Sequence, residues 1–401
     1  MIANSASGVG RHQHTDLLVV QPTPFCNINC SYCYLPHRED KRRLSHQAAE
    51  RIFERLLAFP TIDERVTVVW HAGEPMVLPP HYYEVMFQLI ERLAKPRNVE
   101  ISHCFQTNAT LVTDDWCDLI KKWRVNVGVS IDGPEEFHDR NRRYRDGRGS
   151  FSKAYGGLKK LLAHDIPVHM ISVLTLASLG QPDRMYEFYE QSGVHTVCFN
   201  IEEQEGVNAT SELVENPQQF VELYRAFLRR FFALVLERGA RIGVREFDNA
   251  FRAIGAYRIG QHVNFQTEPF GIVAVDSDGN LSTFSPELLG TDHPTYGAFG
   301  FGNILTDDYD TILRRVNESR LLADINAGVE KCRAECKYFM VCGGGAPANK
   351  IFENNTAASS ETVYCRALQA DIDVVLEMVE RIPIAALTNL QVEASGMMRR
   401  F

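Results

Sequence analysis

The first half of the chain alternates between short, mostly apolar runs and longer runs with apolar residues at helical spacing. The short runs are rich in Val, Ile and aromatic residues, and most are too apolar to expose one side to water. They predict strands at 17–21, 66–70, 100–106, 125–130, 168–173 and 196–201. The longer runs have charged faces and predict helices at 45–58, 80–93, 114–123, 151–164 and 181–192. Ser45 and Asp114 are the expected N-caps of two of these helices.

Such a repeated alternation predicts an α/β fold with a parallel sheet and right-handed crossovers. An open sheet and a partial barrel both fit the pattern. In either arrangement, chemistry belongs at the carboxyl ends of the strands.

The alternation weakens after residue 201. The polar stretch 202–216 predicts a loop, and the apolar face of 220–238 predicts a packed helix. Runs 271–275 and 281–284 flank the turn sequence Asp-Ser-Asp-Gly-Asn and predict a hairpin. We therefore expect an N-terminal extension (1–15), an α/β domain (16–238), an α+β domain (239–385) and a tail (386–401) that is frayed at 397–401.

The chain has 401 residues, of which 45% are hydrophobic and 23% charged, an ordinary globular balance. This composition excludes collagen-like, largely disordered and small disulfide-stapled proteins. The net charge of −9 gives no global argument for nucleic-acid binding. The chain has no apolar stretch long enough to span a bilayer, and its N-terminus lacks the apolar core of a secretory signal. We expect a cytoplasmic protein with neither nucleic acid nor membrane as partner, in a compartment that disfavours disulfides.

Ten cysteines need another explanation in a reducing compartment. Two groups of them are tight, and tight groups in a cytosolic chain indicate metal ligands before disulfides. The first group is Cys26, Cys30 and Cys33, and the second is Cys332, Cys336, Cys342 and Cys365. The remaining three are expected to be small buried apolar side chains: Cys104, Cys117 and Cys198.

The first group directly follows the first predicted strand, with three and then two residues between cysteines and Tyr32 just before the last. Three thiolates on one tight loop can hold three irons of a cubane iron–sulfur cluster and leave the fourth iron open for a substrate. A structural zinc site usually closes all four positions. The spacing, the aromatic residue and the position at a strand end together favour the iron–sulfur interpretation.

This loop resembles the CxxxCx(aromatic)C signature of the radical S-adenosylmethionine (SAM) enzymes. The resemblance covers roughly residues 16–375 and implies a partial (β/α)6 barrel of the TIM type. It implies a [4Fe–4S] cluster on Cys26, Cys30 and Cys33 whose open iron chelates SAM. One electron from the reduced cluster would release a 5′-deoxyadenosyl radical that removes a hydrogen atom from substrate. A flavodoxin- or ferredoxin-type protein is the implied reductant.

Motifs at successive strand ends agree with the resemblance. Residues 72–75, Ala-Gly-Glu-Pro, are similar to the family's GGEP motif, with alanine in place of the first glycine. Singly, each motif could be a turn or a cap, but placement at successive strand ends favours function. Packing and salt bridging explain Ser172 and Arg143 as well as a ligand pocket does. The resemblance implies a SAM pocket that includes Tyr32, Gly73, Glu74, Asn108, Ser130, Asp132, Ser172 and Arg143.

The second cysteine group has gaps of three, five and twenty-two residues. Four thiolates can close either a [4Fe–4S] site or a zinc site, and the spacing alone does not separate the two. The segment resembles the SPASM extension of peptide-modifying radical SAM enzymes, which in full form has seven cysteines and two auxiliary clusters. Here the 281–285 hairpin has no cysteine, and Ala346 stands where another is expected. The resemblance therefore implies one auxiliary [4Fe–4S] cluster.

Enzymes with this extension typically act on ribosomally made precursor peptides. Residues 342–353 and the cysteine-free hairpin are similar to the cyclophane-forming maturases of glycine-rich-repeat precursors. The implied reaction joins an aromatic ring carbon to the Cβ of a residue two positions later. The Cβ radical adds to the ring, and one electron and one proton must then leave. The auxiliary cluster could accept the electron, and the candidates for the base are Glu287, Asp276 and Glu361.

Other functions stay open at this point. Thioether formation in a peptide, or formylglycine formation in a sulfatase, would use the same cofactors. A zinc-binding scaffold without enzymatic activity would leave the strand-end motifs unexplained. About fifteen residues precede the first strand, too few for a peptide-recognition domain. A leader peptide would therefore bind the C-terminal half, an exposed strand edge or another protein.

Overall fold

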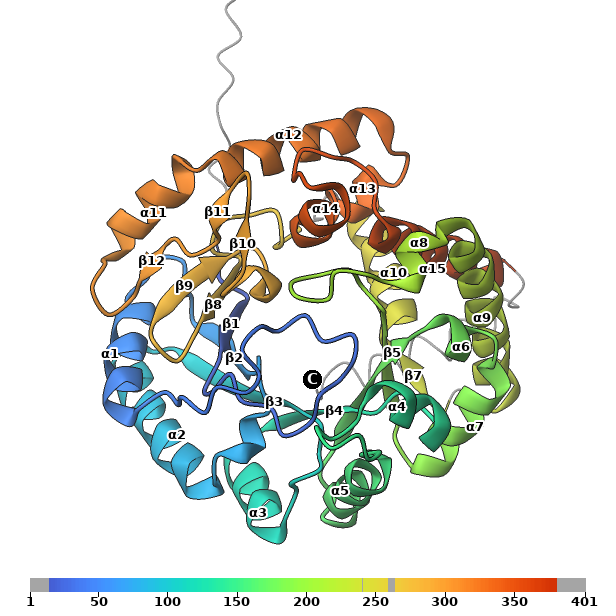
Figure 1. Ribbon diagram of the computed structural model, residues 1–401, viewed down its shortest axis with the longest axis horizontal. Coiled ribbons are helices and arrows are strands. Elements are labelled where there is room, and N and C mark those ends of the chain that lie inside the picture. The colour runs from blue at the N-terminus through green and yellow to red at the C-terminus, as the bar shows by residue number, and fades with distance from the viewer. Residues whose placement is uncertain (1–13, 240, 259–263, 381–401) are drawn as a thin grey trace, which may run out of the picture.

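The computed structural model describes residues 14–239, 241–258 and 264–380, which form a partial barrel of strands with helices around the outside (Figure 1). The α/β fold class predicted from the sequence is confirmed. The expected tail at 386–401, with its frayed end at 397–401, and most of the expected extension at 1–15 lie outside the described residues.

Six parallel strands pair in chain order, and all six were predicted from the sequence to within one residue at each end. They are β1 (Leu17–Val20), β2 (Arg65–Trp70), β3 (Glu100–Thr107), β4 (Asn126–Ser130), β5 (Val168–Leu174) and β6 (Thr196–Ile201). The strand β7 (Gly243–Val244) continues the sheet beyond β6. Since the sheet order ends at β7 on one side and β12 on the other, the barrel is open.

The other side of the sheet is built by the C-terminal part of the chain. The strand β8 (Ile272–Val275) pairs in parallel with β1 and forms the predicted hairpin with β9 (Asn280–Thr283). The strand β12 (Gly302–Asn303) follows β9, and β10 (Asp292–His293) pairs separately with β11 (Gly297–Ala298). The two expected domains, divided at residue 238, thus share one sheet.

Helices cover the outer face of the first six strands. Among them are the five predicted helices, recovered with small shifts at their ends. They are α1 (His46–Leu56), α2 (Pro80–Ala94), α3 (Asp114–Trp123), α4 (Glu135–Asn141), α5 (Phe151–Ala163), α6 (Leu176–Leu179) and α7 (Pro182–Ser192). Short 3₁₀ turns are η1 (Pro75–Val77), η2 (Lys95–Arg97) and η3 (Pro286–Leu288).

The N-cap predictions have different outcomes. Ser45 caps α1, and its hydroxyl accepts a hydrogen bond from the Ala48 amide. Asp114 is not an N-cap, because the extended residue before the helix is Thr113 and Asp114 is the first helical residue. Its carboxylate instead accepts hydrogen bonds from Lys160 and His164.

The C-terminal helices are α8 (Glu212–Glu215), α9 (Pro217–Glu237), α10 (Arg245–Arg258), α11 (Tyr309–Asn317), α12 (Arg320–Glu335), α13 (Phe339–Cys342), α14 (Pro347–Asn354) and α15 (Val363–Val379). The stretch 202–216 is therefore not a loop throughout, because Ser211 caps the short helix α8. Helices α9 and α15 pack together, and Tyr224 donates a hydrogen bond to Asp371 across them.

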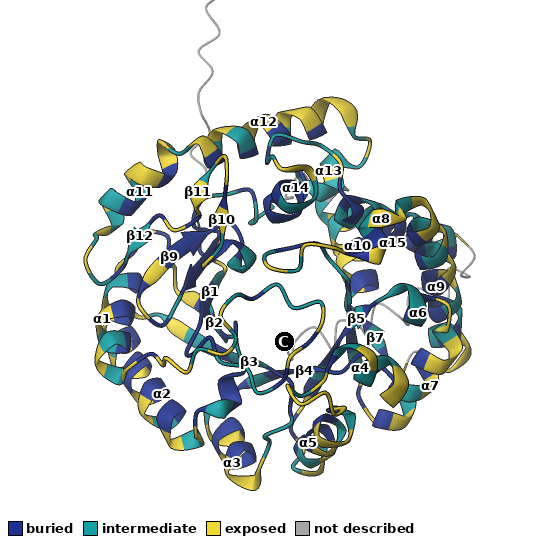
Figure 2. Cartoon of the chain, in the orientation of Figure 1, coloured by how far each residue is buried: buried dark blue, intermediate teal, exposed yellow. Residues whose placement is uncertain are grey.

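The core lies between the sheet and the surrounding helices. Figure 2 shows the helices with buried residues toward the strands and exposed residues outward. Aromatic side chains fill much of this layer, among them the fully buried Trp70, Tyr83, Phe87 and Phe105, which pack in tilted and edge-to-face pairs. None of the helices in the described ranges combines the length and the apolar character that a bilayer crossing requires. This core fixes the strand ends from which the candidate site is built.

Candidate active site

The first cysteine group lies on the loop between β1 and α1, which reaches the centre of the ring (Figure 1). Backbone hydrogen bonds hold this loop in place: Cys26 N–H donates to the Arg38 carbonyl, and Asn29 N–H donates to the Arg143 carbonyl. The Arg38 guanidinium also donates to the carbonyl of Cys30 at 2.9 Å. The loop is therefore held by hydrogen bonds to its own residue Arg38 and by a contact to Arg143, which lies outside it.

The three thiols of this loop influence one another electrostatically. Burial, with the charges of Glu74, Cys30 and Cys33, raises the pKa of the Cys26 thiol. Burial raises the pKa of Cys30 to about 11, against the lowering effect of the Arg142 guanidinium. The raised pKa values of Cys26 and Cys30 fit a site for a metal cluster, since iron binding stabilises the thiolates.

The motif after β2 packs directly against the cysteine loop. Gly73 has a φ of +128°, and a β-carbon there would lie 2.1 Å from the Thr23 carbonyl oxygen. Only glycine fits this contact. Ala72, the departure from the family motif, has a left-handed φ of 64°. Ala72 therefore follows the backbone path of the motif in a left-handed conformation, which is strained for alanine.

Glu74 is 1% exposed and joins the ends of β2 and β3. Its carboxylate accepts hydrogen bonds from the Met76 amide (2.9 Å), the Thr107 hydroxyl (2.7 Å) and the Asn108 amide (2.8 Å). Burial raises the pKa of Glu74 to about 7, and these three donors oppose that shift. Glu74 thus positions Asn108 at the end of β3.

Asn108 connects the end of β3 to the cysteine loop. Its side-chain amide donates to Asn27 at 2.9 Å and lies 3.9 Å from the Cys26 sulfur. Its carbonyl oxygen accepts from the Thr110 amide at 3.0 Å. The sequence prediction placed Asn108 in a ligand cavity, and the structure places it beside the first cysteine.

Asp132, after β4, lies in a buried ion pair that the sequence did not predict. Its side chain is 2% exposed, and one carboxylate oxygen lies 3.0 Å from the Arg142 guanidinium and accepts from the Val173 amide. The Tyr32 hydroxyl donates to the other oxygen. The Arg142 guanidinium stacks over the Tyr32 ring and lies 4.0 Å from the Cys30 sulfur. Tyr32 and Asp132 thus contact each other directly, and Arg142, which was not predicted from the sequence, contacts both.

The neighbouring Arg143 is exposed, and its side chain donates to the Asp139 carbonyl at 2.6 Å. Two further residues predicted for the SAM pocket, Ser130 and Ser172, are buried. Ser130 is 7% exposed at the end of β4. The Ser172 hydroxyl is buried, donates to the Ile131 carbonyl and accepts from Tyr189 at 2.8 Å. Ser172 therefore faces the α7 side of the sheet.

The second cysteine group gathers residues from three helices: Cys332 on α12, Cys336 just beyond it, Cys342 on α13 and Cys365 on α15. Burial raises the pKa of Cys342; amides of the following glycines oppose this shift, and Cys332 and Cys336 reinforce it. Burial raises the pKa of Cys365 to about 11, and the charges of Cys342 and Cys332 add to the shift. The sequence-distant Cys365 thus joins the other three.

The turn at Gly343–Gly345 shapes this second site. All three glycines have positive φ values, of 71°, 112° and 75°, which glycine adopts without strain. The Gly345 amide donates to the Cys342 sulfur at 3.1 Å. A β-carbon at Gly345 would lie 3.2 Å from the Cys365 sulfur. The turn therefore directs a backbone donor at the Cys342 sulfur and lies close to the Cys365 sulfur.

The ten cysteines all lie in the described residues, and none is in a disulfide. Cys117 and Cys198 are buried as predicted, whereas Cys104 is partly exposed. Across the described residues, no group of three or more His, Cys, Asp or Glu side chains converges to hold a single metal ion. In a cubane cluster each thiolate binds a different iron, so its sulfurs need not converge on one point.

Four glutamates, hereafter the central carboxylates, interact with one another and with the tyrosines next to Cys33 and Cys365: Glu203, Glu205, Glu287 and Glu353. Burial raises the pKa of Glu203 to about 7, and the charges of Glu287 and Glu353 reinforce the shift. Burial, with the charges of Glu203 and Glu287, raises the pKa of Glu205 well above its usual range. Glu205 is buried and the other three are partly buried, so these acids share an environment in which not all of them can ionise together.

The loop after β6 carries two of the central carboxylates and contacts both cysteine regions. The Val207 amide donates to the Tyr34 carbonyl at 3.0 Å, one residue beyond Cys33. The Gln204 side chain donates to the Phe352 carbonyl of α14 at 2.9 Å. A β-carbon at Gly206 would lie 2.2 Å from the Tyr34 carbonyl oxygen. Glycine thus allows this loop to lie against the first cysteine loop.

Of the three predicted bases, only Glu287 belongs to this group. Burial raises its pKa, and the Ser285 hydroxyl donates to it. The Asp276 carboxylate accepts from the Asp278 and Asn280 amides within the β8–β9 turn. Glu361 is exposed and pairs with Arg366 at 3.0 Å. The sequence analysis missed Glu203 and Glu205, although two glutamates just beyond a predicted strand were a usable signal.

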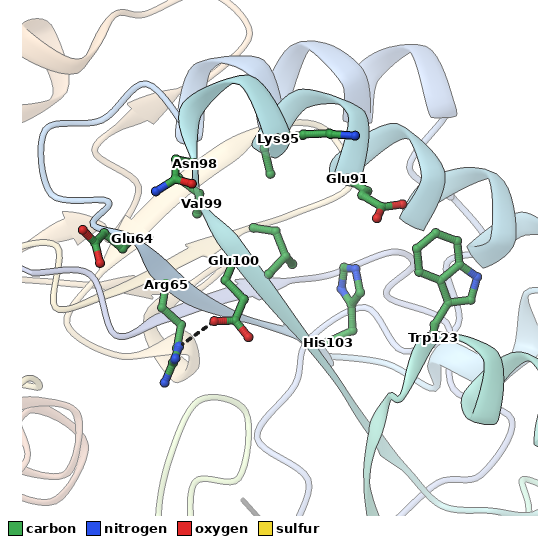
Figure 3. A pocket seen from close by; sticks show the side chains of 11 residues that line it. Glu64, Arg65, Glu91, Lys95, Asn98, Val99, Glu100, His103 and Trp123 are labelled. Atoms are coloured by element: carbon green, nitrogen blue, oxygen red, sulfur yellow. Dashed lines mark hydrogen bonds and ion pairs between the residues drawn. The ribbon is translucent and has the colours of Figure 1, made fainter.

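A cavity of about 810 Å³ lies elsewhere, at the opposite end of the barrel (Figure 3). Arg65 and Glu100, at the amino ends of β2 and β3, form an ion pair there at 3.1 Å. Lys95 and Asn98 come from the loop that leads into β3. Because chemistry in parallel α/β barrels belongs at the carboxyl ends of the strands, this cavity is not part of the candidate site.

Comparisons with known proteins identify the family of the chain. Residues 20–191 match the radical SAM superfamily. The chain is 40% identical to the uncharacterised Synechocystis protein sll1766, over 91% of this chain and 92% of that protein. It is 25% identical to a serine-type anaerobic sulfatase-maturating enzyme of Bacteroides thetaiotaomicron, over 81% of each. The fold matches native anSMEcpe with bound AdoMet and Cp18Cys peptide, with a TM-score of 0.72, 20% identity and coverage of 92% and 99%. The chain therefore belongs to the radical SAM superfamily, whose enzymes use SAM and a [4Fe–4S] cluster.

Proposed function

We propose that this enzyme matures a ribosomally made precursor peptide by joining an aromatic ring carbon to the Cβ of a nearby residue. A peptide substrate is supported by the sulfatase-maturating relative and by the anSMEcpe structure, which holds a peptide as well as AdoMet. The single observation that carries the proposal is the interaction of the central carboxylates with the tyrosines next to both cysteine groups. A protein of the flavodoxin or ferredoxin type is the proposed reductant.

Cys26, Cys30 and Cys33 are the proposed ligands of the radical-generating cluster. When bound, reduced cluster and SAM supply a 5′-deoxyadenosyl radical, which removes one hydrogen atom from the substrate. Gly73 lets the strand-end motif approach the loop, and Glu74 orients Asn108 beside Cys26. Tyr32, Asp132 and Ser130 are proposed residues of the SAM pocket. Ser172, on β5, donates to the Ile131 carbonyl just beyond β4, and the buried Arg142, rather than the exposed Arg143, is the proposed cation of the pocket.

Cys332, Cys336, Cys342 and Cys365 are the proposed ligands of a single auxiliary [4Fe–4S] cluster. Ala346, where a further cysteine would stand, is 2% exposed, and the cysteine-free hairpin residues Ser282 and Thr283 are fully buried. Buried side chains of the packed interior therefore stand at the positions where further cysteines would be expected. Four ligands leave the proposed cluster no open position, which suits electron transfer rather than substrate binding.

The central carboxylates are the proposed proton acceptor. Carbon–carbon bond formation replaces one Cβ–H and one ring C–H, so one hydrogen atom, one electron and one proton must leave. The bound cofactors would take the hydrogen atom and the electron, and a base of this chain takes the proton. Glu203, whose pKa burial raises to about 7, is a matched acceptor at neutral pH. Besides burial, the charges of Glu287 and Glu205 help to raise the pKa of Tyr34, and those of Glu203 and Cys342 help to raise the pKa of Tyr364. The interactions of the central carboxylates thus extend from one cysteine region to the other.

Co-expression with a candidate precursor peptide tests the proposal. The expected product has lost two hydrogens, and its ring-proton NMR signals show one substituted aromatic carbon. Tandem mass spectrometry of the product identifies the joined residues. A product with intact ring protons would contradict the cyclophane reaction.

A second reaction, oxidation of a Ser or Cys side chain to formylglycine, is favoured by the sulfatase-maturating relatives, which match over 81% of this chain. It would use the same cysteines and the same proton acceptor. An aldehyde that reacts with a hydrazine probe, together with unchanged aromatic signals, distinguishes this outcome from a crosslink.

A further inference from the structure

A buried lysine, Lys350 of α14, lies against the second cysteine group. Lys350 is 2% exposed, and its ammonium donates a hydrogen bond to the Cys332 sulfur at 3.3 Å. Within the described parts of the chain, no carboxylate forms an ion pair with it. A buried charge without a counter-charge is strongly disfavoured, so this position needs an anionic partner.

Two glycines make room for the lysine. A β-carbon at Gly328 would lie 3.1 Å from the Lys350 ammonium and 2.2 Å from the Ala357 carbonyl oxygen. A β-carbon at Gly345 would lie 3.5 Å from the terminal methylene of Lys350 and 3.2 Å from the Cys365 sulfur. The side chain therefore reaches between α12 and the glycine turn, with its ammonium against the Cys332 sulfur.

We propose that Lys350 sets the reduction potential of the auxiliary cluster. It acts through Cys332 and touches no substrate, so it is a positioning residue rather than a catalytic one. Reduction adds one negative charge to the cluster, and a nearby ammonium that donates to a ligand sulfur stabilises that charge. Lys350 thereby raises the potential and makes the cluster a better acceptor for the electron that the crosslinked peptide must lose. The proposal rests on the auxiliary cluster proposed above.

The test uses the full-length chain with Cys26, Cys30 and Cys33 all replaced by alanine, so that only the auxiliary cluster remains. Its potential is measured by anaerobic redox titration followed by EPR, without SAM or peptide. Lys350→Met should shift the one-electron equilibrium at least tenfold toward the oxidised form, a drop of about 59 mV or more. Lys350→Arg, which keeps the charge, should restore most of the potential.

The matched control is Lys331→Met. Lys331 is the residue before Cys332 and is exposed, so its charge is screened by water. We expect no shift in the control. An unchanged potential in Lys350→Met, or an equal shift in both variants, would overturn the proposal.

Two further outcomes are decisive. If Lys350→Met fails to hold iron, the potentials of Lys350→Gln and Lys350→Arg are compared, and equal values overturn the proposal. If the triple alanine background itself holds no iron, the auxiliary cluster is absent, and the proposal fails together with that part of the proposed function. Failure of peptide crosslinking alone leaves the potential measurement valid, so the two failures are distinguishable.

Discussion

Each cysteine region has one buried cation against a cysteine sulfur, and the two regions balance that charge differently. Near the first group, Arg142 lies 4.0 Å from the Cys30 sulfur and 3.0 Å from the Asp132 carboxylate. Near the second, Lys350 donates to the Cys332 sulfur and has no such carboxylate among the described residues. The Arg142 charge is therefore balanced by a protein carboxylate, whereas the Lys350 charge is left to act on the cysteine group, which favours accepting an electron there.

The largest expected effect separates the roles of the two cysteine groups. Cys30→Ala should abolish both 5′-deoxyadenosine formation and peptide crosslinking. Cys332→Ala should abolish crosslinking but retain 5′-deoxyadenosine, because radical generation uses only the first group. Chromatography of both products and iron analysis check this, with about eight irons expected in the unmodified protein and about four after loss of either group.

Cys104→Ala is the matched control for both cysteine variants, because Cys104 is a partly exposed cysteine outside both groups. It should change neither iron content nor products. Retained 5′-deoxyadenosine in Cys30→Ala would contradict the assignment of the first group.

The next effect concerns the central carboxylates, which interact with tyrosines of both regions. A base acts when deprotonated, so the crosslinking rate should rise as the pH passes the Glu203 pKa of about 7 and level off above it. Glu203→Gln should remove this rise and slow crosslinking about 10²- to 10⁴-fold, while 5′-deoxyadenosine still forms. Rates are measured by mass spectrometry across the pH range.

The exposed Glu361 provides the comparison for that variant. Glu361→Gln should leave both the rate and its pH profile unchanged, because this carboxylate pairs with Arg366 at the surface. A pH profile of Glu203→Gln identical to that of the unmodified enzyme would exclude Glu203 as the proton acceptor.

A smaller effect tests the charge balance at the first region. Asp132→Asn leaves the buried Arg142 without its counter-charge, which should lower the free energy of unfolding by about 3–5 kcal/mol. Urea unfolding under anaerobic conditions measures this change. The matched variant Asp146→Asn breaks an exposed pair with Arg148 and should leave the unfolding midpoint unchanged.

The smallest effect compares the glycines of the two regions. Gly73→Ala combines a positive φ with a 2.1 Å approach to a backbone carbonyl, and it should cost on the order of 3 kcal/mol. Gly345→Ala meets only side-chain atoms, the Cys365 sulfur at 3.2 Å and the Lys350 terminal methylene at 3.5 Å, and should cost about 1–2 kcal/mol. Thermal unfolding checks the order. Gly147→Ala, with a φ of +85° and open space, isolates the backbone strain, and a cost equal to that of Gly73→Ala would contradict the proposed contact.

Several parts of the site were predictable because the signal was local. The six strands follow from runs of apolar and β-branched residues, and the cysteine spacing follows from adjacent loop positions. Placing Gly73 and Asn108 at strand ends required only that parallel strands share an edge. Arg143 shows the limit: it and Arg142 are neighbours of identical chemistry, and the path of the backbone buries one and exposes the other.

The sequence by itself determined the α/β order of the chain, the two cysteine groups and membership of the radical SAM superfamily, because periodicity and short spacings survive without tertiary contacts. The tertiary structure decided which charges meet. Glu203 and Glu287, Asp132 and Arg142, and Lys350 and Cys332 are far apart in the chain, and each pair is joined only when packing buries it. Burial is also what makes those charges matter, since water screens the same side chains when they are exposed.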